Sequence, residues 1–147
     1  MDPYINEERI SKNPMDLDFT PLESALKSLK EAVRRSEEAP ADDVIRDAVI
    51  QRFEYTYELC WKMLKRQLER EVPSPAELDA LSFSDLFREA AERGIVREIE
   101  PWIEFRHQRN TVAHTYDKKK AESVYQTALK FLPHAVRLHE TLRGRAS

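Results

Sequence analysis

Apolar residues recur along most of this chain at spacings of three and four, the period at which a helix gathers side chains on one face. Between residues 42 and 71 these positions are Ile45, Val49, Phe53, Tyr57, Cys60, Leu64 and Leu68. After residue 117 they are Ala121, Val124, Ala128, Phe131, Ala135, Leu138 and Leu142. The two patterns predict two long helices, each with one buried face.

Residues typical of helix ends divide the first half of the chain. Thr20, Pro21 and Glu23 have the types and spacing of an N-cap, a first-turn proline and the acid of a capping box. We therefore expect the first helix to begin at Thr20 and to end at residues 37–41. The second helix is predicted over residues 42–71, where the apolar face is continuous.

Three further helices are predicted in the second half. Ser82 is typical of an N-cap and Gly94 of the residue that follows a helix, so a short helix is expected between them. The fourth helix is predicted over residues 97–113. The last is expected to start near Asp117, a good capping residue, and to be kinked by Pro133.

Five helices with short connections predict an all-α fold, an antiparallel up-and-down bundle of four to five helices. Glycine, which supplies many turns of β-rich folds, is scarce at 2 residues of 147. We expect a flexible N-terminal arm at residues 1–18, the bundle at 19–142 and a frayed C-terminal tail at 143–147. Aromatic faces left over by so small a bundle favour a second subunit, hence a homodimer.

Composition narrows the function classes. The single cysteine, Cys60, excludes a disulfide framework or a cysteine zinc site within one chain and suits a reducing compartment. No apolar run approaches the length of a signal peptide core or a membrane span, so the expected location is the cytoplasm, without membrane contact. The net charge of -3 is unlike that of a general nucleic-acid binder. DNA binding is not expected, and any RNA contact must come from a local patch.

The candidate chemistry lies in residues 104–117, which gather two arginines, two histidines, two amides and a tyrosine. Arg109 can grip a phosphate with its fork of donors, and His114 can move protons near neutral pH. Together they suffice for metal-independent RNA cleavage in which the RNA's own 2′-hydroxyl is the nucleophile. Further phosphate contacts are predicted for Arg106, Lys118, Lys119 and Lys120. No repeated carboxylate–histidine pattern indicates a metal site, and no cofactor is expected.

The spacing of these residues constrains how they can meet. Asn110 and His114 are four apart and share one face of a helix, whereas Arg109 and His114 diverge by about 140° on an ideal helix. Arg109 and His114 converge only if the helix ends near Ala113, if a ligand bridges them, or if a two-fold axis brings two copies to one groove.

Simpler interpretations exist for each residue taken alone. An arginine or histidine near a helix C-terminus compensates the helix dipole, and a lysine run is commonly a solvated face. A tyrosine such as Tyr116 more often packs than reacts. Trp61 and Trp102 are interpreted as core or interface anchors, and Cys60 as buried and inert.

Two motifs in this chain resemble those of a known family. Arg109, His114 and Tyr116 fit the R-x4-H-x-Y motif of HEPN-domain toxins of the HepT type. Residues 51–62, QRFEYTYELCWK, resemble the QRFE-x-x-x-E-x-x-WK signature of their relatives, the nucleotidyltransferase substrate binding proteins. The resemblance covers roughly residues 17–142, with both motifs in the family's order.

The resemblance implies a HEPN bundle of four to five helices that works as a homodimer with the two motifs facing across the interface. It implies a ribonuclease toxin whose antitoxin is a minimal nucleotidyltransferase that transfers AMP to Tyr116. By position, Arg109 and His114 match the catalytic pair, and Asn110 matches the polar residue after the arginine. An added AMP would bring negative charge into the RNA groove and block it.

Two other hypotheses stay open. The chain could be a non-catalytic partner that presents a substrate to a nucleotidyltransferase, as the name of the second family suggests. It could also be a helical dimer in which the segment around His114 only forms the interface.

Overall fold

The computed structural model describes residues 17–146, and within them every regular element is helical. The α-helices are α2 (Thr20–Glu38), α3 (Asp43–Glu71), α4 (Phe83–Glu92), α5 (Glu100–Thr111) and α6 (Lys118–Ala146). Two 3₁₀ helices, η1 (Pro75–Ala80) and η2 (Val112–His114), lie between them. The predicted all-α class is confirmed. The arm predicted for residues 1–18 lies outside the described residues except for Leu17 and Asp18.

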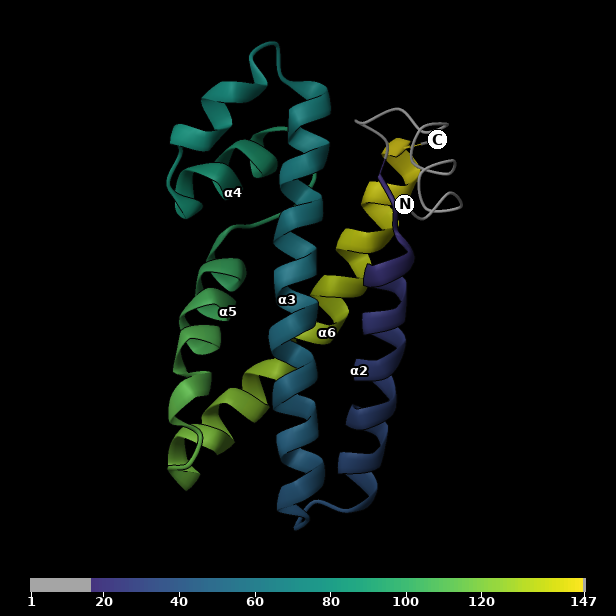
Figure 1. The fold of residues 1–147 in the computed structure, drawn as a ribbon, viewed down its shortest axis with the longest axis vertical. Coiled ribbons are helices and arrows are strands. Elements are labelled where there is room, and N and C mark those ends of the chain that lie inside the picture. Colours follow the sequence, from purple (N-terminus) through teal and green to yellow (C-terminus); the bar gives the residue numbers. More distant parts are fainter. Residues whose placement is uncertain (1–16, 147) are drawn as a thin grey trace, which may run out of the picture.

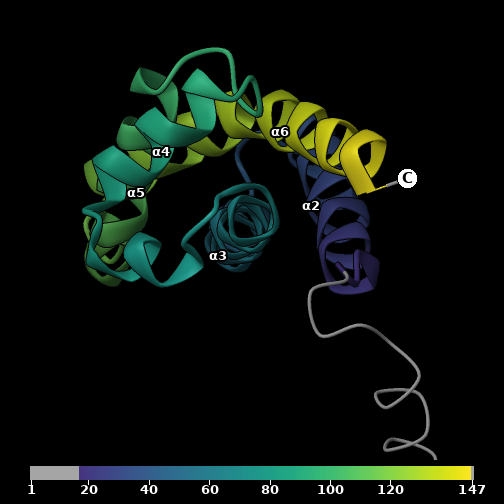
Figure 2. The ribbon, with the colours of Figure 1, turned by 90° about the horizontal axis from the view of Figure 1, so that it is seen from above.

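Helix α3 lies at the centre of the bundle. Figure 1 shows α2 running antiparallel beside α3, with α5 on the other side and α6 crossing behind. Seen from above, α2, α6, α4 and α5 form an arc around α3 (Figure 2), and α3 packs against all four. The continuous apolar face of α3 is explained by this position, because several different helices cover it.

A cluster of aromatic rings forms the centre of the core. Phe131 of α6 makes edge contacts with Phe53, Trp102 and Phe105, at ring-centroid distances of 5.1, 5.9 and 5.3 Å. Trp102 also stacks on Phe87 of α4 at 5.3 Å. These rings are buried, so the interpretation of Trp102 as a core anchor is confirmed.

Three of the predicted helix starts are confirmed by side-chain caps. The Asp42 carboxylate accepts the backbone N–H groups of Val44 and Ile45 at the start of α3. Ser82 caps α4, and Asp117 caps α6. Gly94 has the positive φ of 77° expected of the residue beyond the end of α4.

Helix α2 begins at Thr20 as predicted, but its capping differs from the prediction. The residue before the helix is Phe19, and Thr20 already lies in the first turn without capping it. Phe19 is buried against the His139 ring of α6. Glu23, expected to close a capping box, instead pairs with His139 and Arg143. The Asp18 carboxylate accepts the Thr20 N–H at 3.0 Å at the start of the helix, and Glu23 is bound to α6.

Helix α5 is shorter than predicted. It begins at Glu100 instead of residue 97, with Pro101 in its first turn, and it ends at Thr111. The preceding Ile95 and Val96 are buried in the core as part of the connection from α4. The 3₁₀ helix η1 was not predicted, because its sequence has no helical periodicity.

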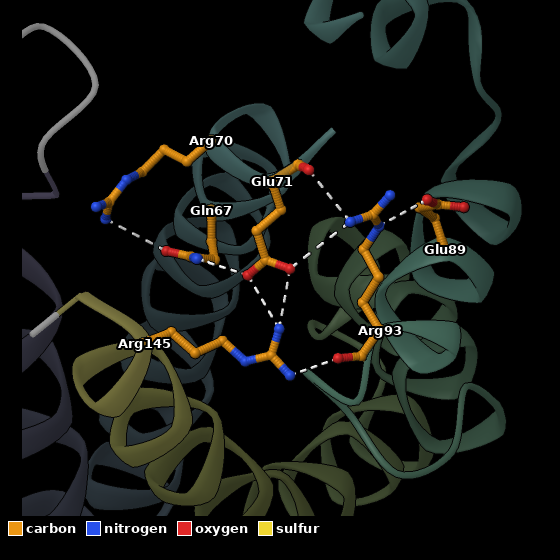
Figure 3. Close-up of polar contacts among 6 residues, drawn as sticks. All are labelled: Gln67, Arg70, Glu71, Glu89, Arg93 and Arg145. Carbon is orange, nitrogen blue, oxygen red and sulfur yellow. Dashed lines mark hydrogen bonds and ion pairs between the residues drawn. The ribbon is translucent and has the colours of Figure 1, made fainter. Parts of the chain in front are cut away.

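The C-terminal segment also differs from the frayed tail expected at residues 143–147. Helix α6 continues to Ala146, and it bends in both views, as expected of a helix that contains Pro133. Arg145 binds both carboxylate oxygens of Glu71 and the backbone carbonyl of Arg93 (Figure 3). These contacts hold the last turn against α3 and the end of α4.

None of the described helices combines the length and apolar character that a membrane span requires. The homodimer stays a prediction.

Candidate functional site

The end of α5 and the turn after it carry the predicted site. Val112 follows the last residue of α5 and packs against the core, which fixes the turn in place. The Thr115 hydroxyl donates to the Val112 carbonyl at 2.9 Å, and the Asp117 N–H donates to the His114 carbonyl at 3.1 Å. Asp117 then starts α6. The turn is thus braced by short-range bonds, while its side chains at His114 and Tyr116 are exposed.

Arg109 is held against α3. Its Nε lies 3.0 Å from Glu58 Oε1, in an ion pair whose angle does not make a hydrogen bond. The other carboxylate oxygen of Glu58 accepts the indole N–H of Trp61 at 3.1 Å. Glu58 and Trp61 both belong to the QRFEYTYELCWK segment, so the two sequence motifs meet in one contact. The motif contains Glu58, but the sequence gave no indication that Glu58 pairs with Arg109.

A cavity of about 320 Å³ opens beside this contact, between α3, η1, α4 and α5. Three aromatic side chains, Tyr57, Trp61 and Phe83, line it. Its polar lining comes from Glu58, Lys65, Asp79, Ser82, Arg106, Arg109 and Asn110. Because η1 and α4 lie far from the motifs in sequence, spacing along the chain held no signal for Asp79, Ser82 or Phe83.

Tyr57 forms the innermost polar part of this lining. Its side chain is 1% exposed, and its hydroxyl has no hydrogen-bond partner among residues 17–146. Burial raises the pKa of the Tyr57 hydroxyl, so it stays protonated at neutral pH. The apolar period of α3 correctly predicted that the Tyr57 ring is buried. It gave no indication of where the hydroxyl lies.

Arg106 and Asn110 also reach the cavity, one turn apart on α5. The guanidinium carbon of Arg106 lies 4.3 Å from the centroid of the Phe83 ring, a cation–π contact. Trp61, interpreted as a core or interface anchor, is half-buried and lines the cavity. Cys60, in contrast, is fully buried, and burial raises the pKa of its thiol. Both observations agree with the interpretation of Cys60 as a buried, inert residue.

His114 and Tyr116 lie outside the cavity, on the exposed turn. Their rings contact edge to face with centroids 6.1 Å apart, and Tyr116 is 83% exposed. Within the described residues no hydrogen bond or ion pair joins Arg109 to His114. Helix α5 ends before His114, which is one of the conditions under which Arg109 and His114 could converge. Within one chain, however, Arg106, Arg109 and Asn110 line the cavity and His114 does not.

The three lysines at the start of α6 are exposed. The backbone N–H groups of Lys119 and Lys120 donate to the Asp117 carboxylate at 2.9 and 3.3 Å. This carboxylate supplies the negative charge that a helix N-terminus favours. The lysines are therefore tolerated without a bound phosphate, and their RNA contacts stay a prediction.

The arrangement offers a fixed cation, a neighbouring cavity and an accessible imidazole. The Arg109 side chain is 35% exposed, so its guanidinium can meet an anion while Glu58 holds its Nε. His114 can exchange protons with a molecule that approaches from solvent. The chemistry available is phosphate binding combined with proton transfer.

Comparisons with known proteins show the family of this chain. Residues 17–144 match the family described as nucleotidyltransferase substrate binding protein like. A Haemophilus influenzae protein named probable ribonuclease HepT is 32% identical over 139 residues, which are 94% of this chain and 95% of that protein.

Two solved structures have the same fold. One, from Haemophilus influenzae, is described as the fold of a substrate binding domain of a nucleotidyltransferase. It superposes with a TM-score of 0.81 at 33% identity, over 86% of this chain and 99% of the other. The second, from Thermus thermophilus, gives a TM-score of 0.63 at 32% identity, over 85% and 98% of the two chains.

Proposed function

The chain belongs to the nucleotidyltransferase substrate binding protein-like family, and on that premise we propose that it is a metal-independent endoribonuclease toxin of the HepT kind. The observation that supports this best is the complete Arg109–His114 pair at the end of α5. Arg109 is held in place by Glu58, and His114 is exposed on a braced turn. A relative of similar length is named as a probable ribonuclease.

In the proposed reaction the 2′-hydroxyl of the RNA attacks the adjacent phosphorus. His114 accepts the proton that the 2′-hydroxyl releases and gives a proton to the leaving 5′-oxygen, and Arg109 stabilises the charge that builds on the phosphate oxygens. The bond from phosphorus to the 5′-oxygen breaks, and the 5′-oxygen takes up a proton. The products are a 2′,3′-cyclic phosphate and a free 5′-hydroxyl.

A homodimer is part of the proposal. Because the side chains of Arg109 and His114 do not meet within one chain, a groove shared by two copies would supply an arginine and a histidine to the same phosphate. The exposed turn and the exposed lysines of α6 would then line that groove. Arg106 would contribute a further phosphate contact.

Regulation by a minimal nucleotidyltransferase completes the proposal. Tyr116 is 83% exposed and can reach the active site of a second enzyme. Its ring centroid lies 6.1 Å from that of His114. An AMP group on Tyr116 would place a phosphate beside the catalytic imidazole, where it would repel RNA and fill the groove.

The second candidate is a non-catalytic partner that presents a substrate to a nucleotidyltransferase. The observation that favours it is the Glu58–Arg109 ion pair beside a cavity, since that arrangement can bind a small molecule without any chemistry of its own. The name of the matched family points the same way.

The test is growth of cells induced to express the wild type, His114→Ala or His107→Ala, with total RNA analysed on a gel. His107 is the matched control, because it is an exposed histidine of the same segment outside the motif. We expect arrest and RNA fragments from the wild type and His107→Ala only. Intact RNA and normal growth with a folded, well-expressed wild type would favour the partner hypothesis instead.

A further inference from the structure

The cavity beside Arg109 has the features of a site for one flat, polar ring. Trp61, Phe83 and the guanidinium of Arg106 are planar groups from three helices, and all line it. Single-stranded RNA is commonly recognised by stacking its bases on aromatic rings and arginine planes. The volume of about 320 Å³ lies within the range of small-molecule pockets.

Two polar atoms in the lining lack hydrogen-bond partners within the described residues. They are the hydroxyl of Tyr57 and the Nε of Arg109, both fully enclosed. A buried polar group without a partner costs free energy, so its presence in a folded protein calls for an explanation. The Nε of Arg109 already has the Glu58 carboxylate 3.0 Å away, so the Tyr57 hydroxyl is the group that calls for a partner, and a ligand with a polar edge would supply it.

The remaining polar lining distinguishes the class of ligand. Tyr57 and Asn110 can each donate and accept, while Glu58 and Asp79 only accept and already pair with Arg109 and Lys65. The edge of a nucleobase carries donors and acceptors side by side and matches such a mixed set. The arginines at 106 and 109 lie on the α5 side of the cavity, on the helix that leads to the turn with His114, where a phosphate attached to the base would meet them.

We propose that this cavity is a nucleotide-binding site that takes a single unstacked base next to the cleaved phosphate. The base enters among Trp61, Phe83 and Tyr57, and its phosphate lies on Arg109. The RNA strand as the source of that base rests on the proposed ribonuclease function. The shared chemistry, a base with its phosphate, would also fit a free mononucleotide.

The experiment measures binding to a short single-stranded RNA with 2′-O-methyl groups, which cannot be cleaved because it lacks the nucleophile. A strand of the same length without bases and the four nucleoside monophosphates serve as further probes. The variants are Tyr57→Phe, Trp61→Ala and the control Tyr55→Phe. Tyr55 lies on the same helix and does not line the cavity.

We expect Tyr57→Phe to weaken binding of the RNA by about three- to tenfold, the effect of one hydrogen bond. Its urea midpoint should stay the same or rise, because the variant removes an unpartnered buried hydroxyl and keeps the ring. Trp61→Ala should weaken binding by about 5- to 100-fold. Tyr55→Phe should bind as the wild type does, and the strand without bases should bind weakly to every variant alike.

The proposal is overturned if the strand without bases binds as tightly as the RNA, or if Tyr57→Phe and Trp61→Ala both bind normally. It is also overturned if neither the RNA nor any mononucleotide binds. Binding of mononucleotides alone, weakened by Tyr57→Phe, would support the site with a free nucleotide as its occupant.

Cleavage assays keep the two proposals separate. Base-dependent binding without cleavage would remove the ribonuclease and leave the site. Cleavage by the wild type with base-independent binding would remove the site and leave the ribonuclease.

Discussion

Glu58 and Glu71 both extend from α3 and both pair with arginines of other helices, but their surroundings differ. Glu71 binds Arg145 through both oxygens, at 3.0 and 2.9 Å, and accepts the Gln67 amide at 2.6 Å. Arg93 lies 3.9 Å away and also binds Glu89 (Figure 3). Each charged group in this cluster has a partner within the chain, and none of these residues lines the cavity beside Arg109.

Glu58 has as many partners, since Lys62 lies 4.0 Å away in addition to Arg109 and Trp61, but it borders a cavity. It holds Arg109 and Trp61 and faces a cavity in which the Tyr57 hydroxyl and the Arg109 Nε lack hydrogen bonds within the described part of the chain. The comparison teaches that an ion pair between helices is not by itself a sign of function. A cluster away from any cavity fastens helices together, whereas one that lines a cavity can also contact a ligand.

The largest expected effect is on activity and comes from Arg109→Ala. Loss of the group that stabilises phosphate charge should lower the rate of RNA cleavage by about 10²- to 10³-fold. The melting temperature should change little, because both side chains of the ion pair keep contact with solvent. Cleavage of a labelled RNA and a thermal scan measure the two quantities. Normal cleavage by Arg109→Ala would show that the Glu58 cluster is structural, like the Glu71 cluster.

The next effect is on stability and comes from Arg145→Ala. This variant removes the bidentate donor of the Glu71 carboxylate, which keeps Gln67 and Arg93, and the Arg145 donor of the Arg93 carbonyl. We expect a loss of about 1–3 kcal/mol in the free energy of unfolding. Urea unfolding measures it, with Lys130→Ala on the exposed side of α6 as the control. RNA cleavage should be unchanged below the unfolding transition. Lower activity in the folded variant would contradict the separation of the two clusters.

A smaller effect is the pH dependence of the Glu71 cluster. Burial alone would raise the pKa of Glu71, but bonds from Gln67 and Arg145 lower it below its ordinary value of 4.5. A lowered pKa in the folded state contributes stability that is present above 4.5 and is lost as pH falls through the folded value. Glu71→Gln should therefore be less stable than the wild type at pH 7, and the difference should shrink below pH 4.5. A constant difference across this range, measured by urea unfolding, would contradict the assignment.

The smallest effect is expected from Trp61→Phe. This variant keeps an aromatic wall in the cavity but removes the indole N–H that orients Glu58. We expect a fall of about two- to fivefold in kcat/KM for RNA and a loss of at most about 1 kcal/mol in stability. Steady-state kinetics beside Trp61→Ala would measure the difference. Equal losses in both variants would mean that the wall of the cavity contributes nothing.

Much of the helical fold could be predicted because the signals are local. The caps at Asp42, Ser82 and Asp117 act on N–H groups within three residues of themselves, and the apolar period of α3 needs only that segment. The helix start at Thr20 was predicted correctly, but the role of Glu23 and the helix after residue 142 were not, because partners distant in the chain decide them. Glu23 pairs with α6 instead of its own helix start, and Arg145 is bound by Glu71.

The candidate site also has a part that local sequence signals predict and a part that only contacts between helices create. The R-x4-H-x-Y motif gave Arg109, Asn110, His114 and Tyr116 as residues to examine, and the cap at Asp117 explains the turn that separates His114 from α6. The pairing of Arg109 with Glu58 joins residues of different helices, and no spacing along the chain predicts it. Phe83 and Asp79 reach the cavity only because η1 and α4 fold back beside α3.

The sequence by itself determined which segments are helical, where most of them begin and which residue types could bind and cleave a phosphodiester. These properties depend on interactions within a few residues, which the order of side chains specifies directly. The tertiary structure alone decided that Glu58 restrains Arg109, that Tyr57 places a buried hydroxyl beside a cavity and that Glu71 receives Arg145. Such contacts depend on how helices pack, because packing brings together groups that the chain keeps far apart.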